Sequence, residues 1–228
     1  MLYTKLLDEY KIDYEEYIKE REVDFFGMKA KYLKYIQTKG VESVTFKPMK
    51  VTTNTGHTYI IRYTFDAHFK YKFMALIARC YRKPEGIYVL ICPSSIIKVG
   101  KCAAYIPHYF DRYRERILKR KHGNKLDVIL TYFENEVKYG IGTMIQNDKY
   151  PDSHIFVANK LVILGSLLKD SNIFEMRTLI SVDMLKEMQK HTCSQLVTHM
   201  KDSITKELGE NSTNTLLRFL SELPDYEV

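Results

Sequence analysis

The sequence predicts an α+β fold, in which a mostly antiparallel meander is followed by helices, a few further strands and a helical C-terminal segment. Two observations predict this class. Between residues 41 and 105, β-branched and aromatic residues recur in short runs that turn-forming residues separate. From residue 182 onward, apolar residues recur at the three- and four-residue spacing of amphipathic helices. The chain of 228 residues, 45% of them apolar, is long enough to bury a sizeable core.

We expect a single domain over residues 1–228 that has three parts. These are an N-terminal helical segment at 1–40, a sheet-containing core at 41–181 and a C-terminal helical segment at 182–228. Within the first part, residues 13–37 lack proline and are dense in Glu, Lys and Tyr. Thr38, Lys39 and Gly40 then supply a basic last turn and a glycine stop, which predicts that the helix ends there.

Four runs at the start of the core predict the antiparallel meander. They cover residues 41–53, 57–65, 70–82 and 86–92. The segments between them hold residues that favour turns, at 54–56, 66–68 and 83–86. A fifth short strand is expected within residues 96–105.

The rest of the core predicts two helices and then three strands. Pro107 stands where a first helical turn accepts proline, so we expect helices at 107–121 and 125–138, separated by His122, Gly123 and Asn124. A loop is expected at 139–153. Apolar or alternating runs then predict strands at 154–159, 160–168 and 173–181.

Composition limits the classes of partner and the compartment. The formal net charge of +7 favours a polyanion such as RNA, although solubility alone would also explain it. The uncharged apolar stretches are much shorter than the roughly 20 residues that span a bilayer, so we expect no membrane association and a cytoplasmic location. No C-x-x-C pair occurs among the four cysteines, which predicts reduced, buried thiols, with a disulfide between Cys80 and Cys92 as the weaker alternative.

The stretch Pro107–Arg116, PHYFDRYRER, carries the strongest functional pattern. On a helix, His108, Arg112 and Arg116 form one stripe, and apolar side chains occupy the opposite side. Two arginines four residues apart repel each other, so an anion is expected nearby. Asp111 could supply it through an ion pair with Arg114, and Glu115 through ion pairs with Arg112 and Lys119, and this is the simpler explanation.

The alternative explanation is a bound phosphate. A histidine at a helix N-terminus is favoured in its neutral form, which leaves one ring nitrogen able to accept a proton. Two guanidinium groups one and two turns further along could hold a phosphate. A base beside a phosphate clamp indicates phosphodiester chemistry.

The segment from Ile96 to Ser181 resembles the RelE/barnase/EndoU/colicin-type ribonuclease superfamily. In the matching pattern, a strand leads into a helix that carries His108, Arg112 and Arg116, and a later strand bears Thr178. The resemblance implies metal-independent RNA cleavage without a cofactor. His108 would be the base that activates the ribose 2′-hydroxyl, and the arginines would stabilise the charge on the phosphoryl oxygens. The general acid is left open between Tyr109, His154 and Lys160.

Two functions from other classes compete with the ribonuclease. Aromatic and basic residues alternate in the sequence, and Tyr109, Lys119, Lys70 and Lys72 could bind nucleic acid without cleaving it. For the two lysines of HFKYKF, a half-buried strand explains the alternation equally well. A structural or protein-interaction role is the third possibility, with an unknown protein partner, because Met184, Met188 and Met200 lie in the amphipathic C-terminal segment. A metal site at His191, Cys193 and His199 is disfavoured, because the first two point in different directions on a helix.

Overall fold

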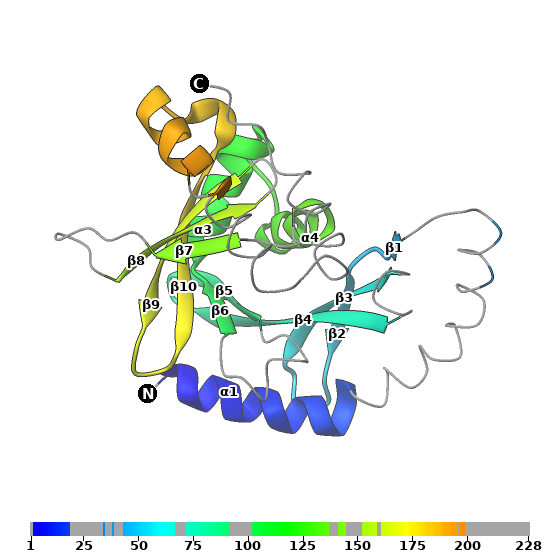
Figure 1. Ribbon diagram of the computed structural model, residues 1–228. Helices are drawn as coiled ribbons and strands as arrows, with labels where there is room; N and C mark the ends of the chain where they lie inside the picture. The colour runs from blue at the N-terminus through cyan, green and yellow to red at the C-terminus, as the bar shows by residue number, and fades with distance from the viewer. Residues whose placement is uncertain are drawn as a thin grey trace. The chain divides into compact units, whose positions relative to one another are not determined.

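The computed structural model describes most of the chain up to residue 198 (Figure 1). The described residues are 2–18, 34, 38, 43–66, 72–91, 102–136, 141–144, 152–158, 161–195 and 197–198. The chain divides into two compact units. Unit 1 comprises Met1–Ala104 and Leu168–Ile173, and unit 2 comprises Tyr105–Leu167 and Phe174–Val228. Helices and mostly antiparallel strands occur in both, so the predicted α+β class is confirmed, while the single-domain assignment stays a prediction.

Unit 1 begins with helix α1, Leu2–Asp13, which continues into a π-helical turn at Tyr14–Ile18. The helix starts earlier than residue 13, where the sequence had predicted it to begin. Leu6, Tyr10 and Asp13 are buried, so these three define the face of α1 that packs on the strands of the unit. The remainder of the predicted helix, apart from residues 34 and 38, lies outside the described residues.

The strands of unit 1 form the predicted meander. They are β1 Ser43–Thr45, β2 Met49–Thr52, β3 Thr58–Asp66, β4 Lys72–Lys83 and β5 Gly86–Ile91, followed by β6 Cys102–Tyr105, which lies beside β5. β3 and β4 pair antiparallel from Thr58 opposite Cys80 to Asp66 opposite Lys72. The β4–β5 turn closes at Gly86, whose φ of 138° suits glycine.

The first predicted strand, 41–53, is divided into two. Both β1 and β2 pair with β3, with Thr45 opposite Thr64 and Met49 opposite Ile61. Three residues therefore face two on β3, which makes a β-bulge. Pro48 lies in this bulge, and because proline has no backbone N–H it cannot continue a ladder of hydrogen bonds.

The core of unit 1 lies between α1 and the sheet. Tyr59, Ile61 and Tyr63 alternate along β3 and pack with Leu6 and Tyr10 of the helix. Residues 60 and 62 on the opposite face of β3 are buried as well, so the strand is covered on both faces. Burial on both faces agrees with the apolar or aromatic residues at 59–61 and 63, whereas Arg62 is a buried charge between them.

The described part of unit 2 begins with two short helices, which are followed by strands. Helix α3, Pro107–Arg112, continues into a π-helical turn at Tyr113–Ile117, and helix α4 spans Lys125–Asn135. The Asn124 side chain accepts a hydrogen bond from the backbone N–H of Leu126 at 3.0 Å and so caps α4. The strands, which lie side by side in the order β10, β9, β8, β7, are β7 Ile141–Met144, β8 Ser153–Ala158, β9 Leu161–Leu168 and β10 Ile173–Ser181.

Strand β7 corrects the prediction of a loop over 139–153. It pairs antiparallel with β8, from Ile141 opposite Val157 to Met144 opposite His154.

The end of the described chain confirms the predicted helical character after residue 182. A 3₁₀ turn at Val182–Met184 precedes helical residues at 187–195 and 197–198, and Met184 and Met188 are exposed.

An aromatic cluster forms the core of unit 2. Its members, all nearly or fully buried, are Tyr105, Tyr109, Phe110, Tyr113, Tyr132 and Phe133. Several rings meet edge to face, and the Tyr109 hydroxyl donates to the Tyr132 hydroxyl at 2.9 Å. The cluster fixes α3 against α4 and thereby positions the helix that carries the predicted site.

Three of the four cysteines, Cys80, Cys102 and Cys193, are buried. Burial raises the pKa of Cys80 to about 12, so this thiol is unreactive at neutral pH. Cys92, the partner of the alternative disulfide, lies outside the described residues. Among the described helices, none has the length and apolar character that crossing a membrane requires.

Candidate nucleic-acid interface

The predicted base lies at the exposed start of α3. His108 is the second residue of the helix and is exposed to solvent. Its Nε2 accepts a hydrogen bond of 3.1 Å from Nε of Arg112. An imidazole nitrogen that accepts a hydrogen bond carries no proton, so this geometry belongs to neutral His108. The sequence therefore placed these two side chains correctly on one face of the helix.

Arg112 is also paired with an acidic neighbour. Its Nη1 lies 3.0 Å from Oε2 of Glu115, and Asp111 lies 3.7 Å from Arg114 and 2.7 Å from Nζ of Lys125. Two of the three ion pairs of the simpler explanation are thus present, whereas Glu115 and Lys119 form none within 4 Å. The anions that offset the repulsion between the arginines come, at least in part, from the helix itself.

Arg116 contacts backbone rather than an acidic side chain. Its Nη1 donates to the carbonyl oxygen of Leu179 at 2.5 Å, which brings this arginine next to Thr178 on β10. Arg116 lies in the π-helical turn, where the N–H of Leu118 bonds five residues back to Tyr113 at 3.1 Å. The α-helical spacing that predicted one continuous stripe does not describe this turn.

The remaining predicted site residues differ in their access to solvent. Tyr109 is 0% exposed, and burial raises its pKa well above the ordinary value, so it has no free face on which a base could stack. Among the other candidates for the general acid, His154 is buried with Nδ1 at 2.8 Å from the carbonyl oxygen of Asp152, and Lys160 lies outside the described residues. Lys70 also lies outside them, and Lys72 begins β4 in a part of that strand whose side chains are not described.

The exposed run Lys119–His122, which we call the basic loop, follows the π-helical turn directly. Within the described chain, its side chains make neither a hydrogen bond nor an ion pair closer than 4 Å. One acidic group lies in its vicinity. The Ser181 hydroxyl, and less strongly Lys119, lower the pKa of Asp183. The cations of the preceding helix are held by hydrogen bonds or ion pairs, whereas those of the loop form no ion pair within 4 Å in the described chain.

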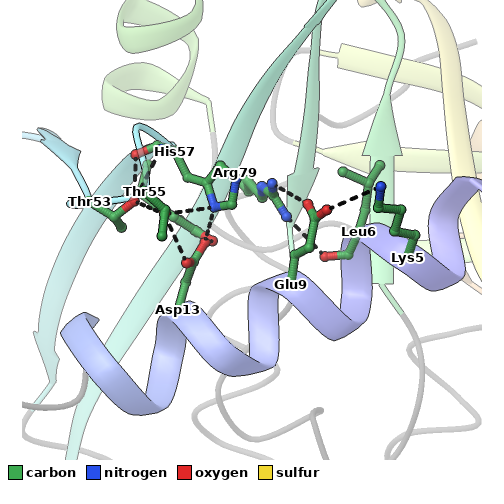
Figure 2. A network of polar contacts seen from close by, with 9 residues as sticks. Lys5, Leu6, Glu9, Asp13, Thr53, Thr55, His57 and Arg79 are labelled. Carbon is green, nitrogen blue, oxygen red and sulfur yellow. Dashed lines mark hydrogen bonds and ion pairs between the residues drawn. The ribbon is translucent and has the colours of Figure 1, made fainter.

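A second concentration of polar groups, in unit 1, was missed by the sequence reasoning (Figure 2). Asp13, at the end of α1, is only 2% exposed and accepts hydrogen bonds from the Tyr59 hydroxyl, from Nδ1 of His57 at 2.7 Å and from the Thr55 hydroxyl at 3.5 Å. Thr53 completes the turn by accepting from the backbone N–H of His57 at 3.0 Å. We call Asp13, Thr55, His57 and Tyr59 the Asp13 network.

An ion pair lies beside the Asp13 network, one turn earlier on α1 (Figure 2). Nη2 of Arg79 lies 2.5 Å from Oε2 of Glu9, and Nη1 donates to the Leu6 carbonyl at 3.3 Å. Glu9 and Asp13 are four residues apart, so they share a helix face with buried Leu6 and Tyr10. Two carboxylates on an apolar helix face are the sequence signal that would have found both contacts.

These contacts satisfy groups that burial would otherwise destabilise, and they hold α1 against β3 and β4. His57, with a side chain 30% exposed, and Thr55, which is exposed, are the members that meet solvent. An imidazole oriented by a carboxylate could act as a base, but within the described chain every contact of the Asp13 network joins parts of unit 1 to one another. We therefore assign the Asp13 network a structural role.

Metal binding finds no support in the described part of the chain, which contains no group of three possible ligands. At the disfavoured site, Cys193 is buried, His191 bonds Gln195 at 2.9 Å and His199 lies outside the described residues. Comparison with family models, with curated protein sequences and with solved structures finds no match.

Proposed function

We propose that the chain binds RNA through the basic loop, together with the exposed side of α3. The observation that carries this proposal is the contrast in pairing along one segment. Arg112, Arg114 and Lys125 form ion pairs, whereas Lys119, Arg120 and Lys121 form none within 4 Å among the described residues. An exposed cation without a partner can neutralise a phosphate without first breaking an ion pair, and it releases a condensed counterion when it does so.

The competing explanation is local. Cations after a helix C-terminus interact favourably with the helix dipole, by about 0.3–1 kcal/mol, and need no ligand. The two explanations differ in what removing the charges does. If the helix dipole explains why cations occur here, removing them lowers the free energy of unfolding and leaves the RNA affinity unchanged. If binding is the reason, affinity falls together with the salt dependence.

The test measures the affinity for a labelled single-stranded RNA over a series of salt concentrations. We expect the parent to bind with a steep salt dependence, and the double variant Arg120→Gln, Lys121→Gln to bind roughly tenfold or more weakly, with a slope smaller by about 0.7 for each lost phosphate contact. The matched control, Lys186→Gln with Lys190→Gln, removes the same formal charge from another segment of unit 2. Equal loss in both variants would show an effect of net charge and would overturn the assignment to the loop.

Ribonuclease activity is the second candidate, and the pairing of exposed His108 with Arg112 favours it. In the proposed reaction, His108 takes the proton of the ribose 2′-hydroxyl, the 2′-oxygen bonds to phosphorus and the bond to the 5′-oxygen breaks. A cyclic phosphate and a free 5′-hydroxyl result, and an acid protonates the leaving oxygen. Arg112 would leave both Glu115 and His108 Nε2 for the phosphate, which frees that nitrogen to accept the proton, while Arg116 and Thr178 would line the far side of the site.

Cleavage is tested on the same RNA in the presence of a chelator. We expect the parent to produce a cyclic phosphate end and His108→Ala to lose this activity by a hundredfold or more. His191→Ala, which removes an exposed histidine of unit 2 outside the basic loop and α3, is the control and should cleave like the parent. Binding without cleavage in the parent would reject the ribonuclease and leave the RNA-binding proposal in place.

A further inference from the structure

One residue of the basic loop has a backbone conformation that its side chain disfavours. Lys119 has a φ of 51°, in the left-handed region. Lysine is disfavoured there because its Cβ approaches the following carbonyl oxygen, a contact that glycine avoids. Among the described residues, Asn172 is the other residue with a side chain that has positive φ, also 51°. Asparagine tolerates this region and Asn172 lies in the turn between β9 and β10, so Lys119 is the unusual case.

The end of the helix imposes this conformation. The N–H of Leu118 bonds to the carbonyl of Tyr113, and the N–H of Arg120 bonds to that of Arg114, each at 3.1 Å. These two bonds on either side of Lys119 close the helix. The residue that closes a helix in the left-handed conformation is usually glycine. Glycine would therefore serve the backbone better than lysine, and the lysine needs another explanation.

We propose that Lys119 contacts a phosphate of the bound RNA, and that the cation is kept at this position at the expense of folding stability. This inference rests on the RNA binding proposed above. Lys119 is exposed and makes no side-chain hydrogen bond within the described chain, so its ammonium group is available. The two flanking backbone bonds fix the position from which the side chain extends, which reduces the freedom lost on binding. Asp183 is the acidic group that would compete with the phosphate for this cation.

The experiment separates the backbone effect from the charge effect with three substitutions. Lys119→Gly removes both the charge and the unfavourable contact, Lys119→Gln removes the charge alone, and Lys119→Arg keeps the charge. The affinity for a labelled single-stranded RNA and the thermal midpoint are measured for each. Asn172→Gly is the matched control, because it makes the same backbone change at the same φ without altering charge.

We expect Lys119→Gly to bind about five- to tenfold more weakly, with a salt slope smaller by about 0.7, and to melt at the same or a higher temperature than the parent. Lys119→Gln should lose the same affinity without the gain in melting temperature, and Lys119→Arg should bind like the parent. Asn172→Gly should leave binding unchanged. Asp183→Asn should strengthen binding, because it removes the competing carboxylate.

Two results would overturn the inference. If Lys119→Gly binds RNA like the parent while the double variant of Arg120 and Lys121 does not, the RNA-binding proposal survives and the role of Lys119 fails. If Lys119→Gly and Lys119→Gln both melt at a lower temperature with unchanged affinity, the lysine stabilises the helix end through its dipole. A parent chain that does not bind RNA overturns both proposals.

Discussion

Charged side chains are used in opposite ways in the two units. In unit 1, Asp13 and Arg79 are 2% and 3% exposed, and both are held by partners from α1 or from the strands. In the basic loop of unit 2, the cations are exposed and make no ion pair within the described chain. A buried charge needs partners because its desolvation is costly, whereas an exposed charge is stable without them. From this difference we expect the buried charges of unit 1 to determine the stability of the fold and the exposed cations of the basic loop to determine binding.

The largest effect is expected when the Asp13 network loses its acceptor. Asp13→Ala leaves the buried Tyr59 hydroxyl without the carboxylate and frees His57, so we expect the free energy of unfolding to fall by about 3 kcal/mol. Urea denaturation checks this value. Asp8→Ala is the control, since Asp8 forms only an exposed contact with Lys11 on the same helix, and it should change stability by less than about 0.5 kcal/mol. Equal effects of the two substitutions would contradict the comparison.

Removing one hydrogen-bond donor to the Asp13 carboxylate should lower the free energy of unfolding less than removing the carboxylate itself. Tyr59→Phe keeps the ring in the core and deletes the hydroxyl that donates to Asp13. Because hydrogen bonds to charged groups contribute more than neutral ones, we expect a loss of about 2 kcal/mol, again measured in urea. Tyr88→Phe, on β5 at the opposite side of β4, is a half-buried tyrosine that serves as control. An unchanged unfolding midpoint for Tyr59→Phe would show that the hydroxyl does not contribute.

Alkaline pH should weaken unit 1 through the same residue. Burial and the neighbouring Asp13 raise the pKa of Tyr59 above its ordinary value near 10. As pH rises, the unfolded chain therefore loses the Tyr59 proton before the folded chain does. The contribution of this raised pKa to the free energy of unfolding is complete below pH 10 and declines as pH rises above it. The slope is about 1 kcal/mol per pH unit for one phenol. Buried tyrosines of unit 2 add to the total, and the difference between the parent and Tyr59→Phe, followed by unfolding at several pH values, isolates Tyr59.

The smallest effect on stability is expected in the basic loop. Arg120→Gln with Lys121→Gln should change the free energy of unfolding by less than about 0.5 kcal/mol, because both side chains are exposed and no carboxylate of the described chain pairs with them. Measuring the thermal midpoint and the RNA affinity of the double variant together shows whether the loop cations act in binding without acting in folding. A large loss of stability would mean that these cations hold the helix end, as Asp13 holds α1.

Local patterns predicted much of the fold. The strands β3, β4 and β5 and the helices α3 and α4 were recognisable from residue periodicity and turn chemistry. Strand β7 was not recognisable from its sequence. Its four residues, IGTM, include glycine and form strand hydrogen bonds only through pairing with β8. The start of α1 was missed because two carboxylates interrupt its apolar face.

In the candidate site too, contacts between residues close in the sequence were predictable and contacts between distant residues were not. The ion pairs of Asp111 and Arg112 follow from a spacing of three residues, which the sequence displays. Tyr109 was proposed to bind nucleic acid, and its burial depends on Tyr132, 23 residues away. The partners of Asp13 are separated from it by 42 to 46 residues, a distance over which periodicity carries no information. The left-handed backbone of Lys119 likewise depends on how the helix closes.

The bulge between β1 and β2 has a consequence for association between molecules. These two short strands cover one side of β3, and among the described strands none pairs with their own outer side, where a second molecule could add a strand. Pro48 offers no N–H to such a strand, and exposed Lys47 and Lys50 would bring like charges together in a symmetric pair. Strand addition at this edge is thereby disfavoured, which protects the sheet of unit 1 from edge-to-edge aggregation.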